Sequence, residues 1–138
     1  MKRAALPELV PATVHQPVVH QPAGQHLLVD LSGIEPQRLN DCATLELLLR
    51  QAAQAAGAHV LFSHFHGFGT GLGVTGVVLL AESHITIHTW PENGYAAADI
   101  FMCGAAQPEL ALAVIEQTLA PASRQINLIE RRARPTDQ

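Results

Sequence analysis

The sequence predicts an α+β fold, a two-layer sandwich in which helices lie on one face of a mainly antiparallel β-sheet. The order of expected elements is the first reason: a strand and a helix precede a run of strands, and a second helix precedes the last strand. Short turns join the strands of the central run, as in hairpins. The 138 residues and 48% hydrophobic content also suit one domain with a single core.

The first expected elements are a short apolar strand over 26–31, a helix and a second strand over 58–65. Asn40 or Asp41 is placed to cap the helix at its start, and Gly57 is a suitable stop at its end. Between these residues, leucines recur at the spacing of one helical face: Leu45, Leu48 and Leu49.

The second half of the chain begins with a glycine-rich loop over 67–73, which holds four glycines in seven residues. Pro91 ends one of the strands that follow, and Pro108 suits the first turn of the second helix. The expected elements are strands over 74–80, 85–90 and 95–103, a helix over 109–119 and a strand over 125–131.

Bulk properties exclude several classes of partner and location. A net charge of −4 gives no reason to expect binding to nucleic acid or to an anionic membrane, and no apolar run has transmembrane length. Cys42 and Cys103 form no CxxC pair, which favours a reduced, cytoplasmic protein. Residues 1–23 contain four prolines and are expected to be a flexible arm, with 24–138 as the single domain.

The stretch from Glu82 to Glu92 concentrates the reactive side chains of the sequence. Read as a strand, it places Ile85, Ile87 and Thr89 on one face and His84, Thr86, His88 and Trp90 on the other. Ser83 then lies near a possible base in the sequence, and a nucleophile close to a base is typical of covalent chemistry.

Continued through Cys103 and Gly104, this stretch resembles the core signature of the bacterial S-adenosylmethionine decarboxylase proenzymes. The resemblance extends upstream to Gly73–Val78 and to Gly24–Leu31. It implies an antiparallel sheet backed by helices and paired into a homodimer. It also implies that the cofactor is a pyruvoyl group made from an internal serine.

The resemblance assigns the self-processing chemistry to named positions. The Ser83 hydroxyl would attack the carbonyl carbon of Glu82, and the resulting ester would eliminate to give chains 1–82 and 83–138, the second beginning with the pyruvoyl group. His88 would be the proton acceptor. Thr75 stands where the family has a serine, and its hydroxyl would bond the processing intermediate.

The resemblance also implies the roles of residues in turnover. The amine of S-adenosylmethionine would form a Schiff base with the pyruvoyl group, and Cys103 would return a proton after CO₂ leaves. Glu92 would accept hydrogen bonds from the ribose hydroxyls. Phe68, or Phe65 as an alternative, would stack on the adenine. The product, decarboxylated S-adenosylmethionine, donates aminopropyl groups in spermidine synthesis.

The loop over 67–73 departs from the family, because it is one residue longer and richer in glycine, so arginine or ornithine is an alternative substrate. A non-catalytic paralogue that is never cleaved is a separate alternative. A zinc site is weighed for four histidines but not expected, because no carboxylate or thiolate lies at ligand spacing. These histidines are His64, His66, His84 and His88.

Overall fold

The computed structural model describes residues 21–136, which form two α-helices and one six-stranded sheet. The strand order is β2-β3-β4-β5-β1-β6, and each neighbouring pair is antiparallel. The bounds are β1 Ala23–Ser32, α1 Cys42–Ala55, β2 Val60–Gly67, β3 Val74–Leu80, β4 Ser83–Trp90, β5 Tyr95–Cys103, α2 Pro108–Leu119 and β6 Ser123–Arg132, with short 3-10 helices η1 at Pro36–Arg38 and η2 at Pro91–Asn93.

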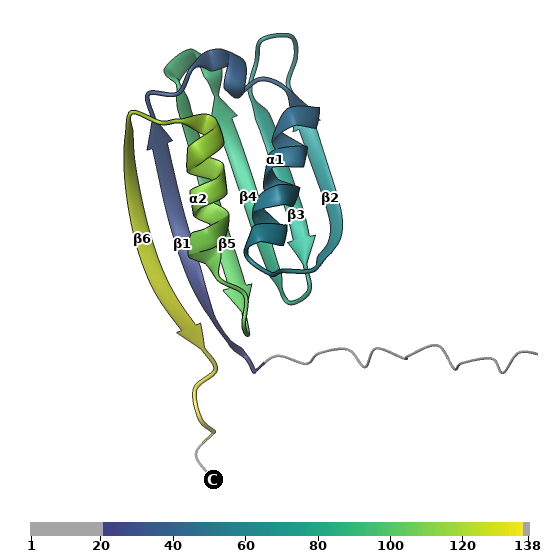
Figure 1. Ribbon diagram of the computed structural model, residues 1–138, viewed down its shortest axis with the longest axis vertical. Coiled ribbons are helices and arrows are strands. Elements are labelled where there is room, and N and C mark those ends of the chain that lie inside the picture. The colour runs from purple at the N-terminus through teal and green to yellow at the C-terminus, as the bar shows by residue number, and fades with distance from the viewer. Residues whose placement is uncertain (1–20, 137–138) are drawn as a thin grey trace, which may run out of the picture.

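Both helices lie on the same face of the sheet, which confirms the predicted α+β two-layer sandwich (Figure 1). Most of the arm expected over 1–23 falls outside the described residues, and Ala23 already belongs to β1. Asp41 is the helix cap, since its carboxylate accepts a hydrogen bond of 2.9 Å from the Thr44 amide. Within residues 21–136, no helix has the length and apolarity needed to cross a membrane.

The alternation predicted for β4 is confirmed by burial. Ile85, Ile87 and Thr89 are buried in the core, which lies between the sheet and the two helices. The side chains of the opposite set lie on the other face of the sheet, which we call the open face because neither helix covers it. The open-face residues of β4 are His84, Thr86, His88 and Trp90.

Thr89 is the buried polar side chain of the described core, and it joins three segments. Its hydroxyl donates to the Leu39 carbonyl at 2.7 Å and accepts from the Val74 amide at 2.8 Å. Buried polar groups need such partners, because an unpaired one keeps its full desolvation cost. Thr89 therefore fixes the end of β4 against β3 and the segment that precedes α1.

Thr89→Val is expected to lower the free energy of unfolding by about 1–3 kcal/mol, because two buried backbone groups lose their partner. Urea unfolding would measure this on chains that also carry Ser83→Ala, which removes the hydroxyl expected to start self-cleavage. Thr70→Val is the matched control, since Thr70 is exposed in the loop after β2. Equal stabilities for Thr89→Val and Thr70→Val would contradict this role.

Candidate active site

The expected cleavage point lies in a tight turn between two strands. Leu80 of β3 pairs with Ser83 of β4, so Ala81 and Glu82 alone form the connection. Glu82 has φ of +58°, in the left-handed region. This conformation costs a non-glycine residue roughly 1–2 kcal/mol. Strained backbone of this kind is often found at reactive sites, and here it immediately precedes the Glu82–Ser83 bond.

Ser83 and Cys103 lie together at this end of the sheet. The Cys103 amide donates a hydrogen bond of 3.2 Å to the Ser83 hydroxyl oxygen, and the Cys103 side chain is buried. Gly24 of β1 lies opposite, where an added Cβ would come within 2.9 Å of Cys103 Sγ. A pocket of about 370 Å³, the cleavage-site pocket, opens here and is lined by Gln21, Pro22, Ala23, Glu82, Phe101, Cys103, Arg131 and Arg132.

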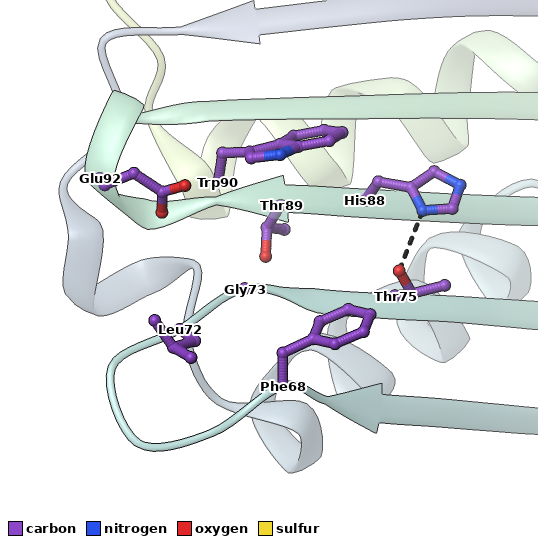
Figure 2. Close-up of a pocket in the computed structure, with 8 residues that line it drawn as sticks. All are labelled: Phe68, Leu72, Gly73, Thr75, His88, Thr89, Trp90 and Glu92. Carbon is purple, nitrogen blue, oxygen red and sulfur yellow. Dashed lines mark hydrogen bonds between the residues drawn. The ribbon is translucent and has the colours of Figure 1, made fainter.

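A second pocket of about 370 Å³, the Trp90 pocket, contains the other expected site residues. Figure 2 shows Phe68 entering from the loop after β2 and Trp90 from the end of β4, with a hydrogen bond of 3.1 Å between Thr75 Oγ1 and His88 Nδ1. The Trp90 pocket is lined by Phe68, Leu72, Gly73, Thr75, His88, Thr89, Trp90 and Glu92.

Sequence reasoning missed Trp90 as a pocket residue. Its ring stacks on Tyr95 with centroids 5.3 Å apart, and it remains partly exposed to the pocket. The alternation that placed Trp90 on the His88 face was the available signal. Phe65, the alternative to Phe68, does not line this pocket, because its ring covers Gly76 so closely that an added Cβ would lie 2.1 Å away.

The two groups of site residues lie at opposite ends of β4. Ser83 begins the strand and His88 follows five positions later, a separation of roughly 17 Å at the rise of an extended strand. Within one chain, His88 is therefore too far from Ser83 to accept its proton, although the two residues are close in the sequence. Glu82, Ser83 and Cys103 form one half-site, and the residues of the Trp90 pocket form the other.

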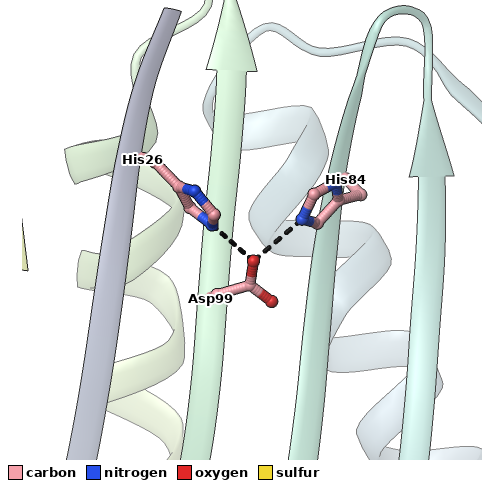
Figure 3. A group of neighbouring side chains, drawn as sticks. All are labelled: His26, His84 and Asp99. Atoms are coloured by element: carbon pink, nitrogen blue, oxygen red, sulfur yellow. Dashed lines mark hydrogen bonds and ion pairs between the residues drawn. The ribbon is translucent and has the colours of Figure 1, made fainter. Parts of the chain in front are cut away.

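A third cluster of polar residues lies on the open face between these half-sites. His26 Nε2 and His84 Nε2 lie 2.5 Å and 2.8 Å from the same oxygen of Asp99, and Thr86 donates to the other oxygen (Figure 3). Burial would raise the pKa of Asp99, but the hydrogen bonds from Thr86, His26 and His84 outweigh burial and lower this pKa from its ordinary value.

This cluster corrects the sequence-based treatment of zinc. Among residues 21–136, the potential ligand group is His26, His84 and Asp99, with ligand atoms within 4.8 Å of one another. The premise that no carboxylate accompanies the histidines is wrong, because the Asp99 carboxylate of β5 is hydrogen-bonded to His84 of β4. The sequence hid this group, since its members come from three strands and His26 is 73 residues from Asp99.

The hydrogen bonds of the cluster nevertheless disfavour a metal. Arg131 lies 3.5 Å from His26 Nδ1, and a guanidinium can only donate, so Nδ1 is the acceptor. The ring hydrogen of a neutral His26 is then on Nε2, where it is donated to Asp99. A nitrogen that carries this hydrogen has no lone pair for a metal ion. The residues therefore fit a hydrogen-bonded cluster better than a metal site.

Comparison with known proteins identifies the family. The profile described as S-adenosylmethionine decarboxylase matches residues 25–132. Proteins named S-adenosylmethionine decarboxylase proenzyme are similar to this chain: one from Methanococcus maripaludis is 44% identical over 78% of the chain and 88% of the relative. Another, from Parasynechococcus marenigrum, is 50% identical over 70% of the chain and 75% of the relative.

A solved structure agrees with these sequence matches. The crystal structure of the adenosylmethionine decarboxylase from Aquifex aeolicus superimposes with a TM-score of 0.76 at 34% identity, covering 86% of this chain and 98% of that one. The sheet order, the two helices on one face and the profile match over most of the domain point the same way. The chain belongs to the S-adenosylmethionine decarboxylase family.

Proposed function

We propose that this chain is a self-processing, pyruvoyl-dependent enzyme that converts S-adenosylmethionine to CO₂ and decarboxylated S-adenosylmethionine. The second product is the aminopropyl donor for spermidine synthesis. The observation that carries the proposal is the geometry at the cleavage point. Glu82 is in a strained conformation, the Ser83 hydroxyl follows it directly, and the amide of Cys103 contacts that hydroxyl. The free thiols of Cys42 and Cys103 suit a cytoplasmic location.

The processing reaction consumes one water and releases one ammonia, and every other heavy atom of the chain is kept. Ser83 Oγ bonds to the Glu82 carbonyl carbon, and the peptide C–N bond breaks to leave an ester and a free amine. Loss of the Ser83 α-proton then expels the Glu82 carboxylate and leaves a dehydroalanine. Water adds to this residue and ammonia departs, which leaves a ketone at position 83. In the mature enzyme this ketone would form a Schiff base with the substrate amine and, with the carbonyl beside it, would supply the electron sink for the loss of CO₂.

The separation of the half-sites supports a homodimer with shared active sites. Two copies packed through their open faces about a two-fold axis bring the Ser83 end of one chain against the His88 end of the other. The open face carries exposed apolar side chains suited to such contact, namely Leu28, Leu79 and Ile129. In this arrangement His88, held by Thr75, accepts the protons of processing in the partner chain.

The Trp90 pocket favours an adenosyl substrate over arginine or ornithine. Phe68 and Trp90 offer aromatic faces for a purine and for the sulfonium cation, and the Glu92 carboxylate can accept bonds from ribose hydroxyls. The loop keeps Phe68 in place through its own backbone, since the Phe68 amide donates to the Gly73 carbonyl at 3.1 Å. Arginine and ornithine have no ring or ribose to occupy these positions.

Mass spectrometry of the purified protein tests the proposal. We expect two chains, one ending at Glu82 and one beginning at residue 83 with a ketone that phenylhydrazine traps. Release of CO₂ from S-adenosylmethionine, but not from arginine or ornithine, would identify the substrate. A chain that stays whole and carries no trappable carbonyl would overturn the proposal, whereas turnover of arginine or ornithine alone would replace only the substrate.

Glu82→Gly is expected to slow self-cleavage, because glycine adopts a positive φ without the strain of a side chain. The folded precursor should gain about 1 kcal/mol relative to Glu82→Gln, which keeps the strain. Timed mass spectrometry of freshly made chains would give the rate. Ala120→Gly is the matched control, since Ala120 also has a positive φ, of 47°, at the end of α2. Equal slowing by both glycine variants would contradict a local role for strain at Glu82.

A further inference from the structure

Self-cleavage, if the proposed function is correct, removes the covalent link between β3 and the start of β4. Before cleavage, residue 83 is tied to β3 through the two-residue turn and pairs with Leu80. Afterwards it is a chain terminus, and the pyruvoyl group has no N–H to donate to a neighbouring strand. New strand ends fray unless other contacts hold them. The reactive ketone must nevertheless remain beside Cys103.

The next residue, His84, has the contact that can hold this terminus. Its Nε2 atom bonds to Asp99 on β5 at 2.8 Å, and Asp99 is held in turn by His26 of β1 at 2.5 Å. Figure 3 shows the three side chains converging from neighbouring strands. Because β1 and β5 are not cut, the carboxylate stays in place when the turn at Glu82 opens.

The cluster also reaches the wall of the cleavage-site pocket. Arg131 of β6 contacts His26 Nδ1, and its guanidinium lies 5.1 Å from the centre of the Phe101 ring. Phe101 lies 5.4 Å and 5.8 Å from the rings of His26 and His84. Since Phe101 and Arg131 line the cleavage-site pocket together with Glu82 and Cys103, the position of His84 is coupled to this pocket.

We propose that Asp99 is a positioning residue of the decarboxylase: by binding His84, it keeps the pyruvoyl terminus beside Cys103 after the chain has been cut. Asp99 acts through His84 and does not touch the substrate. The groups that face it are His26 from β1 and His84 and Thr86 from β4, with Arg131 from β6 behind His26. Its lowered pKa keeps the carboxylate ionised and so a strong acceptor at neutral pH.

Asp99→Ala in the full-length protein tests this role by kinetics. Cleavage and phenylhydrazine-trapped carbonyl should match the wild type, while kcat should fall by roughly 10- to 100-fold, the cost of a misplacement of about 1 Å. The KM should change by less than about twofold, because substrate binding is unaffected. Asp99→Asn keeps one acceptor oxygen for His84 and should lie between. Glu116→Ala is the control, since this carboxylate binds Arg124 at 2.6 Å on the helix side of the molecule.

Hydrogen exchange distinguishes the proposed role of Asp99, which is to anchor the pyruvoyl terminus through His84, from a general stabilisation of the fold. In cleaved protein, Asp99→Ala should speed amide exchange in peptides that begin at residue 84. On chains that also carry Ser83→Ala, where the turn is intact, the same substitution should change exchange in this segment much less. A general structural role would speed exchange equally in cleaved and uncleaved chains.

The outcomes distinguish the anchor from the function on which it rests. A cleaved Asp99→Ala enzyme with wild-type kcat, or with equal exchange changes in cleaved and uncleaved chains, would overturn only the proposed anchoring role of Asp99. Wild-type protein that never cleaves would overturn the proposed function and the anchor with it. If Asp99→Ala does not fold, His84→Ala removes the same hydrogen bond and must show the same pattern of cleavage, kcat and exchange.

Discussion

Ser83→Ala is expected to remain one polypeptide of 138 residues and to release no CO₂ from S-adenosylmethionine. The substitution removes the oxygen that attacks the Glu82 carbonyl, so neither the ester nor the ketone can form. No other side chain can take over this role, because the ketone is made from the atoms of residue 83 itself. Intact-mass spectrometry and a CO₂-release assay on the same preparation would measure both losses.

The matched control for this prediction is Ser63→Ala. Ser63 lies on β2, and its hydroxyl accepts hydrogen bonds from Arg50 at 2.8 Å and 3.0 Å, away from both half-sites. Chains with this substitution should split after Glu82 as the wild type does. If Ser83→Ala chains also split there, Ser83 is not the nucleophile and the processing scheme is wrong.

Cys103→Ala is expected to separate processing from turnover. The contact to Ser83 comes from the Cys103 backbone amide, which alanine retains, so the chain should still cleave and acquire its carbonyl. Loss of the thiol removes the proposed proton donor, and kcat should fall by roughly 10²- to 10⁴-fold, the usual contribution of general acid catalysis. Steady-state CO₂ release, corrected for trapped carbonyl, would measure this fall.

Cys42→Ala provides the control for a lost thiol. Cys42 begins α1 and packs against the core, with its sulfur near Gly67 and in neither pocket. Its removal should leave cleavage unchanged and kcat within about twofold of wild type, since no group that touches the substrate is altered. A Cys103→Ala enzyme as active as Cys42→Ala would show that another group donates the proton.

The fold was predictable from sequence because its signals are local. Alternation in β4 separated Ile85 and Ile87 from His84 and His88, and the structure buries the first pair as predicted. Asp41 could be named as a possible cap from its place just before the helix, and it does cap α1. Such features depend on neighbours within a few residues, which a single sequence displays directly.

The arrangement of the site was not predictable in the same way. Nearness in sequence suggested that Ser83 and His88 act together, but an extended strand carries them apart. The partners of Asp99 were also hidden, since His26 meets it only because β1 pairs with β5. Strand order and register decide both outcomes, and neither is visible in residue types or spacing along one chain.

The claim of an active site shared by two chains is tested most directly by co-expression of Ser83→Ala and His88→Ala chains with different tags. Each variant alone should stay uncleaved. In the mixed dimer, the Ser83 of the His88→Ala chain faces the His88 of its partner, so this chain should split after Glu82 while the Ser83→Ala chain stays whole. Mass spectrometry of purified mixed dimers in which both chains remain intact would contradict the shared site.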